Sequence, residues 1–290
     1  MIYLLFVISS LAGVLNAAMI KLYRKTMPNS PLSDSLFYAV NILGALLFFA
    51  ILCRFDLRVN LVTLLFSGVF ACVSFLSVFL TLRALENTSM VNVSLFSSAG
   101  ALILSSLAGV LLFREQVGAK RFAGLVLTLC SISVPYFAAK KSGTGLKGIL
   151  FCCLIALNSG ACNIIMKLYH TVPGCLDENI FCFYTNVIMI PFVLLRHRQT
   201  FFSRDSLQYL NKMLCKPVFT ALAAVLMGYI ATLLSMYVVG KVDLLFASAF
   251  GPPLTICFNF LFDTFVFREP VKADKIITIL LAIAAIVFLV

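Results

Sequence analysis

Apolar residues occur along this chain in long, nearly unbroken runs, and the polar residues gather in the short segments between them. The runs do not alternate between apolar and polar positions, so the strands of a membrane barrel are not expected. Each run has roughly 17 to 25 residues, enough to cross a hydrocarbon core of about 30 Å as a helix. The pattern therefore predicts an all-α polytopic membrane protein with ten transmembrane helices. The predicted spans are residues 2–22, 34–53, 61–82, 90–113, 121–139, 147–168, 179–195, 217–239, 243–267 and 273–290.

The longest polar connection, between the seventh and eighth spans, has a pattern of its own. The stretch "SRDSLQYLNKMLCK" begins with Ser203, a residue typical of a helix N-cap. Its leucines, Leu207, Leu210 and Leu214, repeat at the spacing of one helical face. We therefore expect an interfacial segment near 200–216, a short helix lying on the membrane surface.

The composition agrees with a membrane protein and limits the kinds of ligand and partner that are expected. Hydrophobic residues make up 62% of the chain, charged residues 11%, and the mean hydropathy is +1.08. The net charge of +11 indicates a preference for membrane surfaces, and nothing indicates nucleic-acid binding. Most cysteines lie inside predicted spans, where a thiol packs as a small apolar group. Neither a metal site nor a cofactor is predicted, because the chain has only two histidines and no CxxC pair.

Short motifs recur in the same order in the two halves of the chain. Residues 21–23, Lys-Leu-Tyr, return at 167–169, and "FREQVGA" at 113–119 returns as "FREPVKA" at 267–273. Each half holds five predicted spans, an odd number, so the second half must enter the bilayer inverted relative to the first. Inverted repeats are typical of secondary transporters. We interpret residues 1–140 and 147–290 as two five-helix repeats of one transport unit.

The motifs also resemble a known family. "GVLNAAMIK" at 13–21 and "RALENTSMVNVSLFSSAGALILSSLAGVLLFREQVGAKRFAG" at 83–124 are similar to EamA-type permeases of the drug/metabolite transporter superfamily. Asn16 and Lys21 match the first-span pattern of that family, and Glu115 and Gly124 match the pattern that ends its fourth span. The resemblance covers nearly the whole chain. It implies alternating-access transport of a small polar organic metabolite, such as an amino acid or a nucleobase derivative.

This chain departs from the family pattern at several positions, and the tryptophan common in the family's first span is missing, since the chain has none. The glycine that precedes the family's glutamate is Arg114 in the first copy and Arg268 in the second, and Thr278 replaces the later glycine of the second copy. The stretch "FCFYTNVIMIP" at 181–191 also resembles the FYNN stretch of Golgi nucleotide-sugar transporters, with Thr185 as the departure. A nucleotide-sugar-type exchanger and a flippase for lipid-linked substrates therefore stay as alternatives within transport.

Two lysines stand at corresponding places in the two halves. Lys21 and Lys167 lie near the carboxyl ends of the first and sixth spans, where a cation favours the helix dipole and a long side chain can reach the interface. The alternative is that they attract an anionic group of the substrate or close a gate. In that case their side chains should point toward the first, fourth, sixth and ninth spans and meet Asn, Tyr or acidic partners there.

Other polar side chains inside the spans are further candidates. Amides and phenols in spans either bond across helices or supply the oriented contacts of a small-molecule site. We expect the fourth and ninth spans to be cavity walls, and the ninth to break at its two prolines. Two acids near the membrane are candidates for proton coupling, or for pairing with arginines at the interface. The candidates are Asn16, Asn163, Tyr38, Tyr184, Asn41, Asn186, Ser97, Ser98, Ser248, Pro252 and Pro253, with Glu86 and Asp263 for coupling.

The function expected from these features is secondary transport without enzymatic activity. No ATP-binding loop of the GxxxxGK[ST] type occurs, so a gradient or an exchanged solute must supply the energy. A membrane-embedded enzyme is not expected, because the acids are scattered and form no cluster with the histidines. The expected partners are a small-molecule substrate and the lipid bilayer of the plasma membrane, with a homodimer as one assembly. Orientation stays open, because the charge bias of the connections places both termini outside and the resemblance places them inside.

Overall fold

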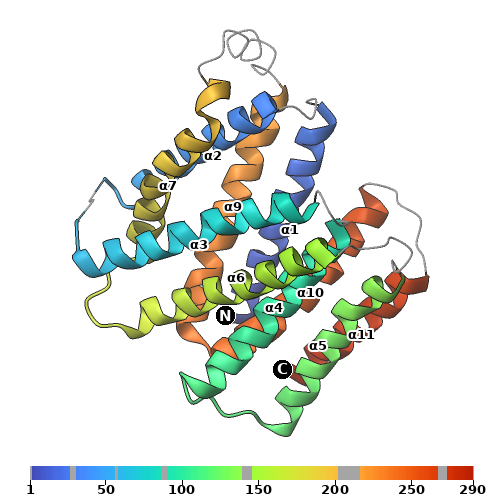
Figure 1. The fold of residues 1–290 in the computed structure, drawn as a ribbon. Coiled ribbons are helices and arrows are strands. Elements are labelled where there is room, and N and C mark those ends of the chain that lie inside the picture. The colour runs from blue at the N-terminus through green and yellow to red at the C-terminus, as the bar shows by residue number, and fades with distance from the viewer. Residues whose placement is uncertain are drawn as a thin grey trace. The chain divides into compact units, whose positions relative to one another are not determined.

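The computed structural model describes residues 2–26, 31–55, 58–85, 90–138, 146–201, 216–266 and 273–289. Within these residues the chain forms ten α-helices and no strand (Figure 1). This confirms the all-α fold class that the apolar pattern predicts. The helices are α1 (Ile2–Thr26), α2 (Pro31–Leu52), α3 (Leu61–Leu85), α4 (Met90–Leu111), α5 (Ala119–Ala138), α6 (Leu146–Thr171), α7 (Glu178–Phe201), α9 (Lys216–Lys241), α10 (Leu244–Phe265) and α11 (Ala273–Leu289).

Each predicted span coincides with one helix, and most ends agree within a few residues. The largest difference is at the end of α7, which continues to Phe201 although its apolar run ends near residue 195. Arginine and glutamine favour helices, and extending an existing helix needs no new nucleation. Of the predicted surface helix near 200–216, residues 202–215 lie outside the described residues.

The helices fit a membrane protein by length and composition. Among the described residues, 5 helices are long and apolar enough to cross a membrane. Four further helices contain shorter apolar segments, Phe37–Leu52, Leu61–Ser77, Phe96–Leu111 and Lys275–Leu289. The five longer spans are Ile2–Ile20, Leu150–Thr171, Glu178–Leu195, Val218–Lys241 and Leu244–Phe262.

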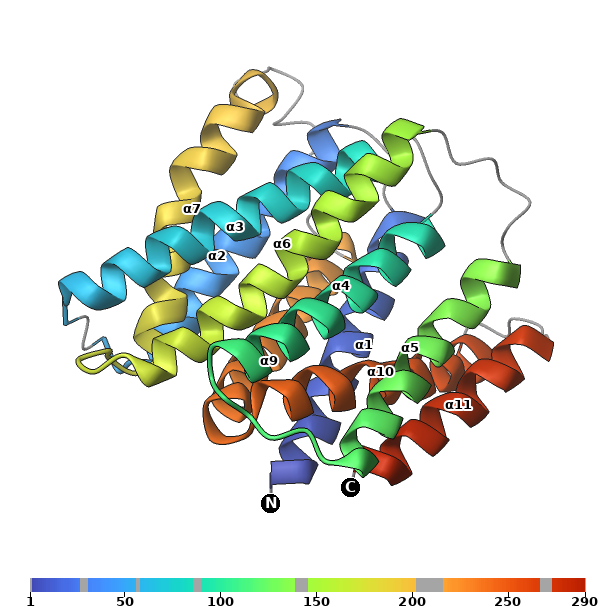
Figure 2. The same ribbon diagram turned by 60° about the horizontal axis from the view of Figure 1, so that its bottom comes forward.

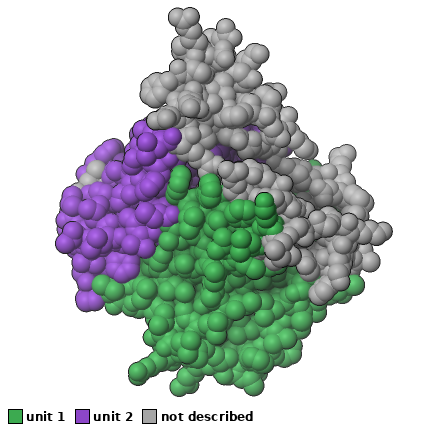
Figure 3. Space-filling model, in the orientation of Figure 1, with its two compact units in different colours: residues 1–10, 73–172, 236–290 green, residues 11–72, 173–235 purple. Residues whose placement is uncertain are grey.

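The chain divides into two compact units (Figure 3). Unit 1 comprises residues 1–10, 73–172 and 236–290, and unit 2 comprises residues 11–72 and 173–235. Helices α4, α5, α6, α10 and α11 therefore belong to unit 1, α2 and α7 belong to unit 2, and α1, α3 and α9 contribute residues to both. Each unit combines parts of both predicted repeats.

Close backbone approach characterises unit 1. Helix α4 packs along α6, and a Cβ atom at Gly100 of α4 would overlap the backbone of Ala156 of α6. Helices α5 and α11 lie side by side (Figure 2). A Cβ atom at Gly124 of α5 would lie only 2.6 Å from Cγ of Leu289 in α11. Small residues at such positions are the usual means by which helices associate in a membrane, where dispersion contacts replace the hydrophobic effect.

Aromatic packing and polar links hold unit 2 together. Helices α2 and α7 pack against each other. Tyr23 of α1 is buried against Ala221 of α9, and its ring centroid lies 5.0 Å from that of Phe37 in α2. At the start of α3, the Ser67 hydroxyl donates to the carbonyl of Phe181 in α7 at 3.1 Å. These contacts join α1, α2, α3, α7 and α9 within the unit.

The predicted break at the two prolines of α10 is wrong. Helix α10 continues from Leu244 to Phe265 through Pro252 and Pro253. Proline has no N–H, so the carbonyls of Ser248 and Ala249 lose their helical donors. The Thr128 hydroxyl of α5 donates to the Gly124 carbonyl of its own helix at 2.9 Å and lies 3.4 Å from the Ala249 carbonyl oxygen. One of the two freed carbonyls thus faces a polar group of a neighbouring helix at the outer limit of hydrogen-bond distance.

Candidate functional site

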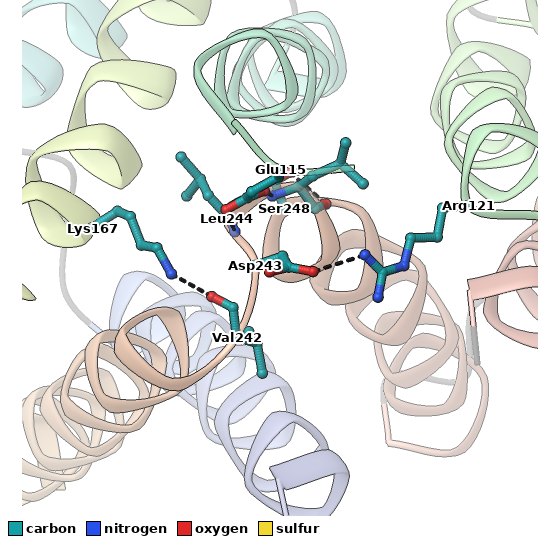
Figure 4. Close-up of polar contacts among 8 residues, drawn as sticks. Glu115, Arg121, Lys167, Val242, Asp243, Leu244 and Ser248 are labelled. Atoms are coloured by element: carbon teal, nitrogen blue, oxygen red, sulfur yellow. Dashed lines mark hydrogen bonds and ion pairs between the residues drawn. The ribbon is translucent and has the colours of Figure 1, made fainter. Parts of the chain in front are cut away.

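The turn between α9 and α10 is held by charged side chains from three other elements of unit 1 (Figure 4). Lys167 of α6 donates from Nζ to the carbonyls of Val239 at 3.1 Å and Val242 at 2.5 Å. The last carbonyls of a helix have no intrahelical donor and form the negative end of its dipole. The Lys167 ammonium therefore satisfies two acceptors at the end of α9 and places its charge where the dipole favours it.

The first N–H groups of α10 are capped by a side chain that is distant in sequence. Glu115, in the connection between α4 and α5, accepts from the backbone N–H of Leu244 at 2.5 Å and of Leu245 at 2.8 Å. Both carboxylate oxygens are used, one for each N–H. A carboxylate at a helix N-terminus satisfies unpaired donors and meets the positive end of the dipole. Glu115 thus fixes the start of α10.

A left-handed residue aims Glu115 at this helix. Arg114 has φ +54°, and the next N–H, that of Glu115, donates back to the Gly109 carbonyl of α4 at 2.9 Å. A Cβ atom at Gly109 would lie 2.6 Å from Oε2 of Glu115, so only glycine leaves room for the carboxylate. Positive φ is easy for glycine and strained for other residues. Arg114 thus stands in a backbone conformation that glycine adopts more readily.

Two further contacts complete this part of unit 1. Asp243, in the α9–α10 turn, pairs with Arg121 of α5 at 2.7 Å, with both side chains partly exposed. Nε2 of His170 in α6 lies 3.0 Å from the Met236 carbonyl of α9. A Cβ atom at Gly240 would approach the His170 ring to 2.8 Å, so glycine makes this contact possible. We call Glu115, Arg121, Lys167, His170 and Asp243 the junction clamp.

The ammonium of Lys167 has partners other than those expected of a gate or ligand residue. That interpretation predicts Asn, Tyr or acidic partners, whereas the described contacts of the ammonium are backbone carbonyls. Helix-end carbonyls cannot be recognised from residue types, because every residue carries one. Asn163, one turn earlier on α6, donates to the Ser105 hydroxyl of α4 at 3.2 Å. The side chain of Lys21 lies outside the described residues.

Unit 2 contains a second polar cluster, centred on Tyr229 of α9. Its hydroxyl oxygen lies 2.5 Å from Oδ1 of Asn41 in α2 and 3.0 Å from Oδ1 of Asn186 in α7. Nδ2 of Asn186 donates to the Cys182 carbonyl at 2.8 Å, which fixes the orientation of that amide. One hydroxyl has one proton, so Tyr229 donates to one of the two amide oxygens at a time, and the shorter distance is to Asn41. Three helices are thereby joined.

The predicted candidates Asn41 and Asn186 therefore come together, through a residue that the sequence did not single out. Tyr229 follows Gly228 in "LMGYIATLL" at 226–234, and a tyrosine inside a long apolar run is the signal that marks it. Asn16 of α1 lies nearby in the same unit and donates to the Ala224 carbonyl of α9 at 2.6 Å. A Cβ atom at Gly228 would lie 2.5 Å from Nδ2 of Asn16, so this amide also depends on glycine.

The remaining candidates take part in packing or local bonds. The hydroxyl oxygens of Ser97 in α4 and Ser159 in α6 are 2.7 Å apart. Ser98, the residue after Ser97, is half-buried. Ser248 is buried and donates to the Leu245 carbonyl of its own helix at 3.0 Å. The Tyr184 hydroxyl lies 3.5 Å from the Arg58 carbonyl.

The cavity role predicted for α4 and α10 stays a prediction. Tyr38 is half-buried in α2, and its ring is in edge contact with that of Phe37. Glu86 and the side chain of Asp263, the two candidates for proton coupling, lie outside the described residues.

Comparison with known proteins bears on the fold. No described protein family matches the sequence, and no curated protein matches it. Among solved structures, 29 chains are similar. One is a crystal structure of a protein described without a name or an organism, similar over 98% of this chain and 97% of that chain, with a TM-score of 0.65 and 16% sequence identity. At this identity, the likeness establishes a shared fold and carries no information on function.

Proposed function

We propose that this chain is a secondary transporter of the EamA type, which moves a small polar organic metabolite across the plasma membrane by alternating access. Its ten helices cross the bilayer as two inverted five-helix repeats. The observation that carries the proposal is the contact of helices with their own counterparts. By order and shared motifs, α4 corresponds to α10, α5 to α11 and α2 to α7. Each of these pairs is in contact within its unit.

The direction of these contacts supports inversion. Gly109 near the end of α4 would place a Cβ atom 3.4 Å from Cβ of Leu245 at the start of α10. Gly124 near the start of α5 approaches Leu289 at the end of α11. In both pairs, the beginning of one helix meets the end of its counterpart. A two-fold axis in the membrane plane relates counterparts in this antiparallel way, as in transporters with inverted repeats.

The junction clamp suggests how Lys167 acts in such a cycle. Its ammonium is hydrogen-bonded to carbonyls at the end of α9. It therefore holds the α9–α10 turn in place and is not free to bind an anion in this state. We assign Lys167 the role of a gate residue, which must leave Val239 and Val242 when this turn moves. The repeat assigns Lys21 the corresponding role in the first half. A substrate anion that competes for the ammonium would favour the open turn.

Uptake by reconstituted protein tests the proposal. Purified protein in liposomes is presented with radiolabelled L-amino acids, nucleobases and nucleosides, with empty liposomes as the control. We expect saturable uptake of at least one of these solutes. If a family member of known substrate is active in the same liposomes and this chain moves none of the panel, transport of this solute class is wrong. Uptake only of nucleotide sugars, or translocation only of lipid-linked sugars, would favour the alternatives within transport.

A further inference from the structure

Asn158 of α6 is a buried polar residue that neither the junction clamp nor the Tyr229 cluster uses. It retains only 6% of its exposed area, and its Nδ2 atom is without a hydrogen-bond partner among the described residues. Buried side-chain amides in native proteins nearly always have a partner, and each exception needs an explanation. The cost is greatest in a membrane protein, because hydrocarbon supplies no acceptor.

Among the described residues, Ser106 of α4 and Asn179 of α7 also have a buried polar atom without a partner, but Asn158 is the case on α6. Ser159 shares a hydrogen bond with Ser97 of α4, and Asn163 donates to Ser105 of α4. Lys167 donates to the end of α9. Each of these three polar side chains of α6 finds a partner on a neighbouring element, so the helix is not poorly packed in general. Only the amide nitrogen of Asn158 is buried without one among the described parts of α6.

A leucine of similar shape would fill the same space without the desolvation cost. The unpaired asparagine therefore lowers the stability of the folded protein. Such a group is explained if it gains a partner in another state of the protein. We propose that Asn158 is a solute-binding residue, whose amide N–H donates to a carbonyl, carboxylate or hydroxyl oxygen of the transported solute. In the state described here, α6 keeps this donor buried, and the transport cycle exposes it. This inference rests on the proposed function.

The first arm of the test measures stability. Asn158→Leu removes the unpaired donor and keeps the shape, so we expect the melting temperature of the purified protein to rise by about 2 to 4 °C. Ser159→Ala is the matched control, because it removes a partnered hydroxyl from the adjacent position, and it should not raise the melting temperature. If Asn158→Leu lowers the melting temperature, the amide has a partner in the folded protein and the proposal is wrong.

The second arm measures transport of whichever panel solute the wild-type protein takes up. Asn158→Leu should raise the KM for this solute about tenfold, the effect of one lost hydrogen bond, while Ser159→Ala leaves KM unchanged. Asn158→Ala removes the same donor without adding bulk and should raise KM to a similar extent, should leucine prevent folding. Unchanged KM in both Asn158 variants would overturn the assignment.

The two arms separate this inference from the proposed function. A wild-type protein that moves no solute refutes transport, and the role of Asn158 falls with it. A wild-type protein that transports, combined with a more stable Asn158→Leu variant that transports equally well, refutes only the role of Asn158. That result would show that the buried amide of Asn158 lacks a partner in the folded protein and takes no part in binding the solute.

Discussion

Glu115 caps α10 although Asp243 occupies the N-cap position of that helix. Asp243 has the extended backbone of an N-cap residue and makes no side-chain capping bond, since its carboxylate pairs with Arg121. The carboxylate of Glu115 instead accepts from the first two N–H groups of α10. Because Glu115 caps α10 in place of Asp243, the α4–α5 connection is linked to the α9–α10 turn. The start of α10 therefore depends on a residue that is distant in sequence.

Glu115→Ala should therefore destabilise the protein more than Asp243→Ala. Loss of a helix cap costs about 1 kcal/mol, and a partly exposed ion pair such as Asp243–Arg121 contributes about 0.2 to 1 kcal/mol. Thermal unfolding of the two variants in the same detergent measures the order. An equal or larger loss in Asp243→Ala would show that Asp243 is the real cap.

Arg114→Gly should stabilise the protein slightly. Relief of the left-handed strain is worth about 1 to 2 kcal/mol and is partly offset by the greater entropy of glycine in the unfolded chain, about 0.5 to 1 kcal/mol. Arg114→Val, with a branched Cβ, should lower the melting temperature instead. If both substitutions act in the same direction, φ at residue 114 does not limit the stability of this connection.

Gly100→Ala should destabilise the α4–α6 packing, because its methyl group would overlap the backbone of Ala156. Overpacking of this kind costs about 1 to 3 kcal/mol. Gly13→Ala in α1 is the matched control, since no atom outside its chain neighbours and own helix backbone lies within 4 Å of the added Cβ and alanine favours helix by about 1 kcal/mol. We expect opposite shifts in melting temperature. Equal shifts would mean that α4 and α6 do not approach at Gly100.

Tyr229→Phe removes the hydroxyl that joins Asn41 and Asn186 while keeping the ring against Phe48 and Phe49. Bonds between membrane helices contribute about 0.6 to 2 kcal/mol, so a loss of stability in this range is expected. The double variant Tyr229→Phe with Asn41→Leu should lose less than the sum of the two single variants, because both remove one shared bond. If the loss of stability in the double variant equals the sum of the two single losses, the side chains of Tyr229 and Asn41 do not interact.

Apolar run lengths determine the helices, and this part of the fold follows from the sequence alone. The boundaries agree because the helices end near the polar residues that end each apolar run. The continuity of α10 through Pro252 and Pro253 was not predictable from the prolines alone, because the packing of neighbouring helices decides whether a helix continues past them.

The sequence predicts which residues belong to the candidate site, but it does not predict which of them bond to one another. Asn41 and Asn186 were identified as polar residues in spans, but only the packing of α9 brings Tyr229 between them. Glu115 was recognised through the resemblance, and its role required the position of α10. Lys167 was expected to meet side chains, and backbone carbonyls at a helix end leave no mark in residue identity.

Solute counterflow tests alternating access most directly. Liposomes containing the protein are loaded with an excess of an unlabelled solute that the uptake panel identifies, and then diluted into a trace of the labelled form. A carrier with one site that faces each side in turn gives a transient accumulation of label above equilibrium. The same assay on Lys167→Met should show a weaker transient, because the ammonium no longer closes the α9–α10 turn, while Lys147→Met, at the exposed start of α6, should behave as wild type. A label that equilibrates without any transient accumulation in the wild-type protein would contradict alternating access.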